Sequence, residues 1–141
     1  MKATSIIPCL GYKDAVTAIE WLCNAFGFEK HQVFEENGIV SHAELKLGDG
    51  MIMIGSQQYN SPYGKLTTHP SDVNGLETQS PYIVIDTIDE HYTRAKKHGA
   101  KIIIDLKEES YGGKNYSCYD LEGHLWNFGS YDPWKQKTST S

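Results

Sequence analysis

Two residues with acid–base side chains, His42 and Glu44, stand two positions apart in the stretch 39–47. Polar residues alternate there with Ser41, Ala43, Leu45 and Leu47, which is typical of a strand with one buried face. The two side chains would share the other face, about 6.5–7 Å apart. An imidazole beside a carboxylate could act as a general acid–base pair or hold a displaced metal ion. A hydrogen-bonded pair on a solvated strand face is the simpler interpretation, and the sequence favours it.

A second informative stretch, residues 111–134, reads as a hairpin near the C-terminus. Residues 114–121 and 124–131 are compatible with two extended strands, and Glu122-Gly123 between them is a turn signal. His124 follows this turn, where we expect it to stabilise the turn and not to act in catalysis.

An earlier copy of this pattern indicates an internal repeat. Shifting the sequence by 73 residues lays Gly50 on Gly123 and Pro8 on Pro81. The same shift, within one residue, aligns residues 14–27 with 87–99, and both segments have the apolar spacing of a helix. The predicted order is therefore βαβββ, a linker and βαβββ. This is an α+β protein in which one helix per module covers one face of a curved mixed sheet.

The repeat also sets the expected domain boundaries. We expect a single domain over residues 1–141, with a first module at 5–56 and a second module at 80–131. The polar segment 57–79, which contains prolines and glycines, is predicted to be an inter-module linker or a lid loop. Residues 132–141 would form a tail.

Composition excludes several classes of function. The formal net charge is −5 and there is no basic run, so neither nucleic acid nor a membrane surface is an expected partner. No apolar stretch approaches the roughly 18–20 residues that cross a bilayer, and no signal peptide is recognisable. The three cysteines, Cys9, Cys23 and Cys118, lack paired spacing, which predicts buried free thiols and a cytoplasmic location.

The hairpin pattern Y-G…Y…D-x-E-G-H-L-W-x-F-G and the helix end at residues 95–100 resemble the vicinal oxygen chelate superfamily. That superfamily includes glyoxalase I, bleomycin-resistance proteins, fosfomycin-resistance transferases and extradiol dioxygenases, and the resemblance covers almost the whole chain. It implies two βαβββ modules around a concave cleft (the glyoxalase/bleomycin-resistance/dioxygenase fold), and a homodimer with cavities at or near its interface. Whether modules pair within or between chains stays open.

The resemblance also implies four positions for metal ligands, on the first and last strands of each module. Counted onto this sequence, they fall at Ile7, Ile54, Ser80 and Asn127. Isoleucine has no lone pair to offer, and hydroxyl and amide groups are poor substitutes for imidazole or carboxylate. We therefore expect no metal and no other cofactor at these positions.

Alternation along the predicted strands defines the wall of the cleft. Ile52 and Ile54 would share a face with Ile7, while Trp126 and Phe128 would point toward the helix. The predicted ligand-binding residues are His42, Glu44, Ile54, Ser80, Tyr82, Asn115, Ser117, Tyr119 and Asn127. The four remaining histidines fall on predicted surfaces and receive no role: His31, His69, His91 and His98.

Three functions remain open at the level of sequence. The favoured one is a glyoxalase/bleomycin-resistance-like protein that binds a small hydrophobic or aromatic compound without metal, as a homodimer. The second is a metal-dependent lyase, isomerase or dioxygenase with a non-standard site at His42 and Glu44, the candidate catalytic residues. The third is a structural dimer without ligand.

Overall fold

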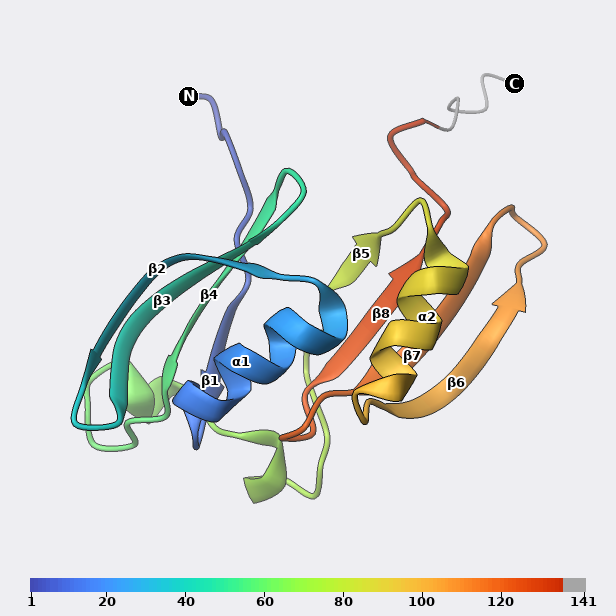
Figure 1. Cartoon of the computed structure of the whole chain (residues 1–141). Helices are drawn as coiled ribbons and strands as arrows, with labels where there is room; N and C mark the ends of the chain where they lie inside the picture. Colours follow the sequence, from blue (N-terminus) through green and yellow to red (C-terminus); the bar gives the residue numbers. More distant parts are fainter. Residues whose placement is uncertain (136–141) are drawn as a thin grey trace.

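The computed structural model describes residues 1–135 as two similar halves, each with one helix and one sheet (Figure 1). The first half contains β1 (Cys9–Tyr12), α1 (Ala15–Phe26), β2 (Glu29–Glu36), β3 (Ile39–Leu47) and β4 (Gly50–Ser56). The second contains β5 (Tyr82–Val84), α2 (Ile88–Lys97), β6 (Lys101–Glu108), β7 (Lys114–Tyr119) and β8 (Leu125–Gly129). Two 3₁₀ turns, η1 (Gly64–Leu66) and η2 (Pro70–Asp72), lie between the halves. The predicted order of elements is confirmed.

Both sheets have the same mixed topology. Their strand orders are β1-β4-β3-β2 and β5-β8-β7-β6, with the outer pairs β1–β4 and β5–β8 parallel and the other pairs antiparallel. A parallel neighbour requires a crossover connection, which α1 and the hairpin after it provide in the first half. The predicted α+β fold with two mixed sheets is therefore confirmed.

Local signals set the ends of α1. The Asp14 side chain accepts a hydrogen bond from the Thr17 backbone N–H at 3.2 Å, which satisfies one free donor of the first turn. Gly27 ends the helix at φ 88°, a left-handed conformation that favours glycine. The buried residues recur at helical spacing and form one stripe: Ala15, Ala18, Ile19, Leu22, Ala25 and Phe26. None of the helices in residues 1–135 is long and apolar enough to cross a bilayer.

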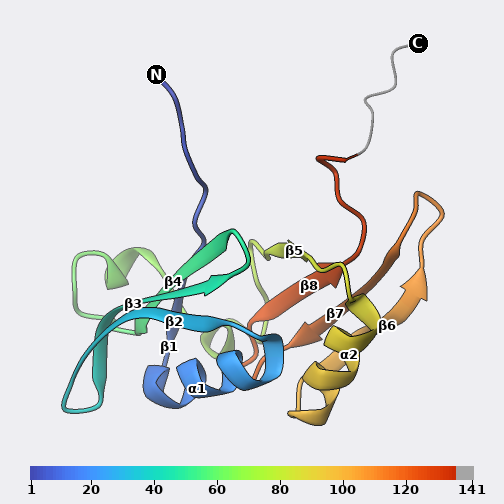
Figure 2. The same ribbon diagram turned by 45° about the horizontal axis from the view of Figure 1, so that its top comes forward.

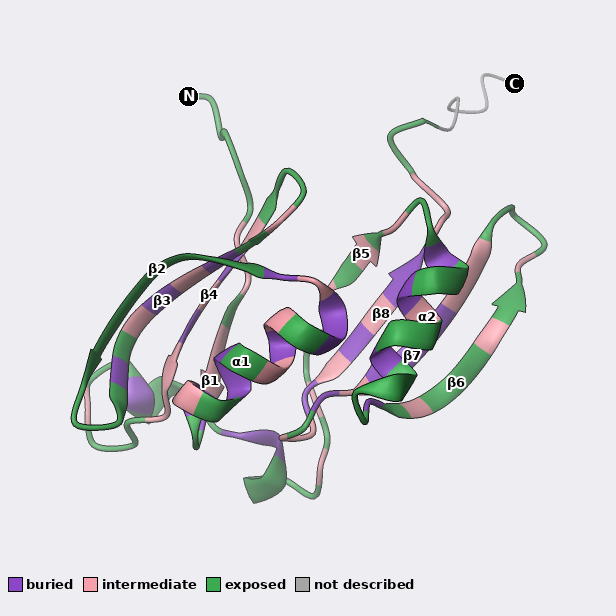
Figure 3. Cartoon of the chain, viewed as in Figure 1, coloured by how far each residue is buried: buried purple, intermediate pink, exposed green. Residues whose placement is uncertain are grey.

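The core continues from one half into the other. The ring of Phe26, at the end of α1, lies 5.4 Å from that of Trp126 and 4.7 Å from that of Phe128, both on β8. These two β8 residues are fully buried, as predicted. The helices lie side by side against one face of the paired sheets (Figures 1 and 2), and buried residues lie on both helices and on strands β3, β4, β7 and β8 (Figure 3). Within residues 1–135, neither α-helix covers the opposite face of either sheet.

Candidate functional site

The predicted residues of the second half share the face that α2 does not cover. Strand pairing sets Asn115, Ser117 and Tyr119 of β7 beside Gly129, Asn127 and Leu125 of β8, and it sets Tyr82 of β5 beside Asn127. The residues that alternate with them are fully buried on the helix side: Tyr116, Cys118, Trp126 and Phe128. Because side chains alternate along a strand, the predicted set points away from α2. We call this surface the open face of the second sheet.

Asn127 is held at the centre of the open face by neutral groups. Its Nδ2 donates to Ser80 Oγ at 2.9 Å and to the Pro81 carbonyl at 3.1 Å, while its Oδ1 accepts from Ser117 Oγ at 2.7 Å. Three of the predicted residues thus form one hydrogen-bonded group. With its amide engaged in this way, Asn127 presents a fixed, uncharged polar surface.

Three tyrosines gather at one end of the open face, and we call Tyr82, Tyr111 and Tyr131 the tyrosine cluster. Tyr82 Oη donates to the Tyr131 carbonyl at 2.8 Å, and the rings of Tyr111 and Tyr131 meet edge to face at 4.9 Å. Asn115 Nδ2 donates to Tyr111 Oη. Tyr82 and Tyr111 remain 40% and 55% exposed, so their rings are accessible to a ligand.

Gly129 gives the tyrosine cluster its shape. A Cβ built on Gly129 would lie 2.4 Å from both Tyr82 Oη and Asn115 Oδ1, closer than real Cβ contacts. The missing side chain lets the Tyr82 ring, which starts on β5, reach across β8 toward β7. Sequence reasoning named Tyr82 and Asn115 for this surface but assigned no role to Tyr131, because its neighbours come from strands far apart in the chain.

The first half carries the predicted pair on its open face. His42 Nε2 lies 2.8 Å from Glu44 Oε2, and Nε2 of His31 on β2 lies 3.8 Å from the other carboxylate oxygen. The ring of Phe34 stacks on His42 with centroids 6.3 Å apart. The predicted hydrogen-bonded pair is therefore present, and its role in binding or catalysis stays a prediction.

The predicted position of Ile54 is wrong. Ile54 pairs with Ala43 on β3, and both are buried in the core beneath α1. Met53, which pairs with Glu44 and Cys9, lies on the open face instead. The turn that joins β7 to β8 is one residue longer than the turn that joins β3 to β4, counted between equivalent strand pairs. A constant shift of 73 residues therefore fails at β4.

With this correction, the positions of the family's metal ligands are Ile7, Met53, Ser80 and Asn127. An alkyl chain, a thioether, a hydroxyl and an engaged amide do not form a site for zinc, iron or manganese. Within residues 1–135, no group of three or more His, Cys, Asp or Glu side chains is arranged to hold a metal ion. The side chains at these positions therefore do not fit a metal ion.

Two histidines that were predicted on the surface, His69 and His91, are buried, and so is His124. His69 Nε2 lies 2.9 Å from Glu122 Oε1, and His124 Nδ1 lies 2.9 Å from Glu77 Oε2. His124 Nε2 also donates to the Gly11 carbonyl at 2.7 Å. His124 thus bonds to distant segments, beyond its own turn, and no local sequence signal marks such contacts.

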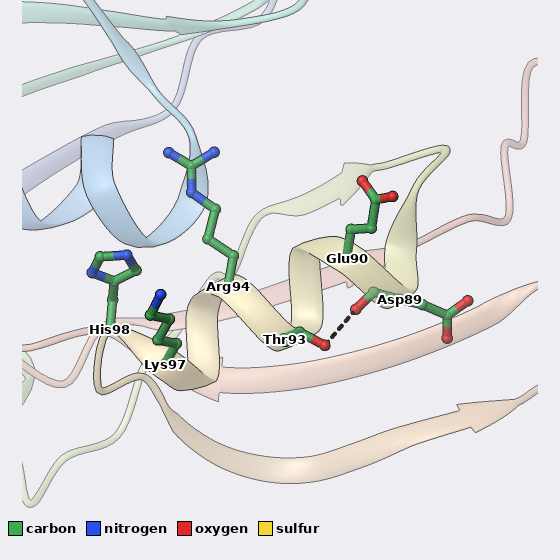
Figure 4. A pocket seen from close by; sticks show the side chains of 6 residues that line it. All are labelled: Asp89, Glu90, Thr93, Arg94, Lys97 and His98. Atoms are coloured by element: carbon green, nitrogen blue, oxygen red, sulfur yellow. Dashed lines mark hydrogen bonds between the residues drawn. The ribbon is translucent and has the colours of Figure 1, made fainter.

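A hollow of about 450 Å³ lies on the outer side of α2, away from both open faces (Figure 4). Polar and charged side chains line it: Asp89, Glu90, Thr93, Arg94, Lys97 and His98. Arg94 is directed toward the end of α1, where its guanidinium donates to the Asn24 and Cys23 carbonyls. Binding of a ligand there would compete with these bonds, so we interpret the hollow as solvated helix surface.

Comparisons with known proteins agree with this architecture. TioX from Micromonospora sp. ML1 is 28% identical, with a TM-score of 0.70 over 90% of this chain and 98% of its own. The fosfomycin resistance protein FosX from Mesorhizobium loti shares the fold at 14% identity, with a TM-score of 0.64 over 96% of this chain and 98% of its own. The uncharacterized protein Mb0911c of Mycobacterium bovis is 25% identical over 126 residues, which are 89% of this chain and 82% of that protein.

A family model matches residues 7–128, which span both halves and both open faces. The chain belongs to the Glyoxalase/Bleomycin resistance protein/Dioxygenase superfamily.

Proposed function

We propose that this protein binds a small hydrophobic or aromatic compound on the open face of the second sheet, without a metal and without forming a covalent bond. The observation that carries the proposal is the tyrosine cluster, whose Tyr82 and Tyr111 rings are 40% and 55% exposed beside the amides of Asn115 and Asn127. Exposed rings offer apolar area to a ligand, and the amides beside them add a neutral polar border.

Magnitudes favour an aromatic ligand over a small polar one. Each 100 Å² of apolar surface removed from water contributes about 2.5 kcal/mol, whereas one neutral hydrogen bond contributes about 1 kcal/mol net. The Asn127 amide already has protein partners, so it gives little to a ligand that relies on polar contacts alone. Ring contact with Tyr82 and Tyr111 would therefore supply most of the affinity.

A second copy of the chain is the proposed partner. Both open faces expose large apolar side chains, with Phe34 53% exposed on the first sheet and Ile104 51% exposed on the second. A homodimer would cover these side chains and enclose the ligand between two sheets. Phe34→Glu should shift the mass measured by sedimentation equilibrium toward the monomer, whereas a monomeric wild-type protein would contradict the dimer.

Thermal denaturation with a panel of planar aromatic compounds tests the binding site. A ligand at 100 times its dissociation constant should stabilise the wild-type protein by about 2.7 kcal/mol. Tyr82→Ala should abolish this shift, because the change removes a ring of the cluster. Tyr63→Ala, which removes a 65% exposed ring in the 57–79 segment, is the matched control and should respond like the wild type. Equal stabilisation of all three proteins would overturn the proposed site.

The contact of 2.8 Å between His42 and Glu44 supports one alternative, a metal-dependent or acid–base enzyme centred on the first sheet. Metal analysis of protein purified without chelators separates the two functions. One zinc or iron per chain, lost in His42→Ala, would favour the enzyme and contradict metal-free binding. Substoichiometric metal in both proteins is the result that we expect.

A further inference from the structure

The tyrosine cluster lies near one acidic side chain, that of Asp132. Burial raises the pKa of the Tyr82 phenol, and the neighbouring Tyr111, Tyr131 and Asp132 raise it further, of which Asp132 is the carboxylate. Lys107 pairs with Asn115 from edge strand β6, so strands β7 and β8 separate it from Tyr82 on β5.

A neighbouring oxygen has no partner. Asn115 Oδ1 is the one buried side-chain nitrogen or oxygen within residues 1–135 that forms no hydrogen bond. It faces the notch at Gly129, where Tyr82 Oη also lies. An unpaired buried acceptor costs free energy unless a donor or a positive charge approaches it.

The tyrosine rings also favour a positively charged ligand. The face of an aromatic ring carries the negative part of its quadrupole, so it attracts a cation placed over it. Two exposed ring surfaces, the Asp132 carboxylate and the Asn115 carbonyl oxygen therefore favour positive charge at one end of the open face.

We infer that the compound bound on the open face is a positively charged aromatic, such as a heteroaromatic cation or an aromatic ammonium. Its ring lies against Tyr82 and Tyr111, and its charge lies toward Asp132 and Asn115. This inference rests on the proposed function and narrows it, because a neutral aromatic compound would satisfy the general proposal equally well.

The test compares two probes of nearly the same shape, 1-methylquinolinium and quinoline, at pH 8, where quinoline is uncharged. Isothermal titration should give the cation about tenfold tighter binding, within the range of cation–π and charge attraction at a partly exposed site. Asp132→Asn should reduce this preference about threefold and leave quinoline binding unchanged. Tyr82→Ala should weaken both probes, and Asp105→Asn, an exposed acid on β6, should weaken neither.

The outcomes that contradict the charge preference differ from those that contradict the proposed function. Equal affinity for both probes, with both weakened in Tyr82→Ala, would overturn the charge preference and leave the aromatic site in place. Tighter binding of quinoline than of its cation would overturn it as well. If neither probe binds and no compound of the aromatic panel stabilises the protein, the proposed function fails together with the inference. A cation preference that shrinks as salt is raised would support the inference, because partly exposed charges are screened.

Discussion

At the scale of single residues, the Asp120 carboxylate joins the start of the first half to the last hairpin. Its Oδ2 accepts from Tyr12 Oη at 2.6 Å and from Trp126 Nε1 at 3.0 Å, and its Oδ1 accepts from the backbone N–H groups of Glu122 and His124. Burial raises the pKa of the Tyr12 phenol well above its usual value, and Asp120 raises it further. The phenol therefore stays protonated and remains a donor.

Replacing this carboxylate should destabilise the fold. Asp120→Asn removes the charge and turns an NH₂ group toward donors, so we expect the free energy of unfolding to fall by about 2–4 kcal/mol. Urea denaturation followed by tryptophan fluorescence measures the change. Asp105→Asn, an exposed acid that accepts from Tyr92, should leave stability almost unchanged. Equal effects of the two substitutions would show that burial of the Asp120 network is unimportant.

The three thiols should differ in reactivity. The prediction that all three thiols are buried is wrong for Cys9, which is exposed. Burial raises the pKa of Cys118 to about 12 and also raises that of the half-buried Cys23. The thiolate is the reactive form, so Ellman's reagent should modify Cys9 first in the native protein. Cys9→Ser should remove the fast phase, and Cys118 should react only after unfolding. Fast modification of Cys118 in the native protein would contradict its buried position.

At the scale of elements, the two helices satisfy each other's C-terminal carbonyls. Arg94 of α2 donates to the Asn24 and Cys23 carbonyls, and His91 Nε2 donates to the Phe26 carbonyl at 2.9 Å. In return, Trp21 Nε1 of α1 donates to the His98 carbonyl at 2.8 Å. Helix ends leave such carbonyls free, so this exchange stabilises the contact between the two halves.

This helix contact should be sensitive to acid. Burial lowers the pKa of His91, which accepts from Tyr116 Oη and stays neutral in the fold. Below about pH 6.5 the unfolded chain binds a proton that folded His91 does not bind, so the free energy of unfolding falls as pH decreases. We expect His91→Gln to flatten this dependence between pH 7 and pH 5, measured by urea denaturation.

His98→Gln, a substitution at the exposed end of α2, is the matched control for His91 and should keep the wild-type dependence. A His91→Gln profile that superimposes on that of the wild type would remove His91 as the source of the effect.

At the scale of the whole molecule, hydrogen bonds to Glu122 connect the 57–79 segment and the start of α1 to the last hairpin. Its Oε1 accepts from the Lys13 N–H at 2.7 Å and from His69 Nε2 at 2.9 Å, and its Oε2 accepts from the Asp14 N–H at 2.8 Å. The contact between His124 and Glu77 holds the same segment at a second point. Three distant parts of the chain are thus joined by the Glu122 carboxylate and by the contact between His124 and Glu77.

Proteolysis can measure this attachment, because Lys65 is the one trypsin site within residues 57–79. Glu122→Ala leaves three donors without an acceptor, at a cost of about 1–3 kcal/mol each if they stay buried, so local opening should become easier. We expect cleavage after Lys65 to accelerate at least tenfold in limited trypsin digestion. Glu108→Ala, a change of an exposed acid at the end of β6, should not alter the rate, and similar rates for both variants would contradict the attachment.

Local sequence signals determined most elements of the fold. Asp14 and Gly27 set the ends of α1, and Asn37-Gly38 adopts the positive φ angles of 53° and 81° that a two-residue hairpin turn needs. The alternation around His42 and Glu44 predicted which face of β3 is buried. These features depend on neighbours within a few residues, so the sequence contains the information directly.

Tertiary structure alone decided the rest. The turn between β7 and β8 is one residue longer than the turn between β3 and β4, so Met53, and not Ile54, lies on the open face of the first sheet. A shift of one residue moves every side chain of a strand to the other side of the sheet. Burial of His69 and His91 and assembly of the tyrosine cluster depend on partners tens of residues away. Such contacts follow from the packing of whole elements, which pairing and turn length fix in space, and no local pattern in the sequence encodes them.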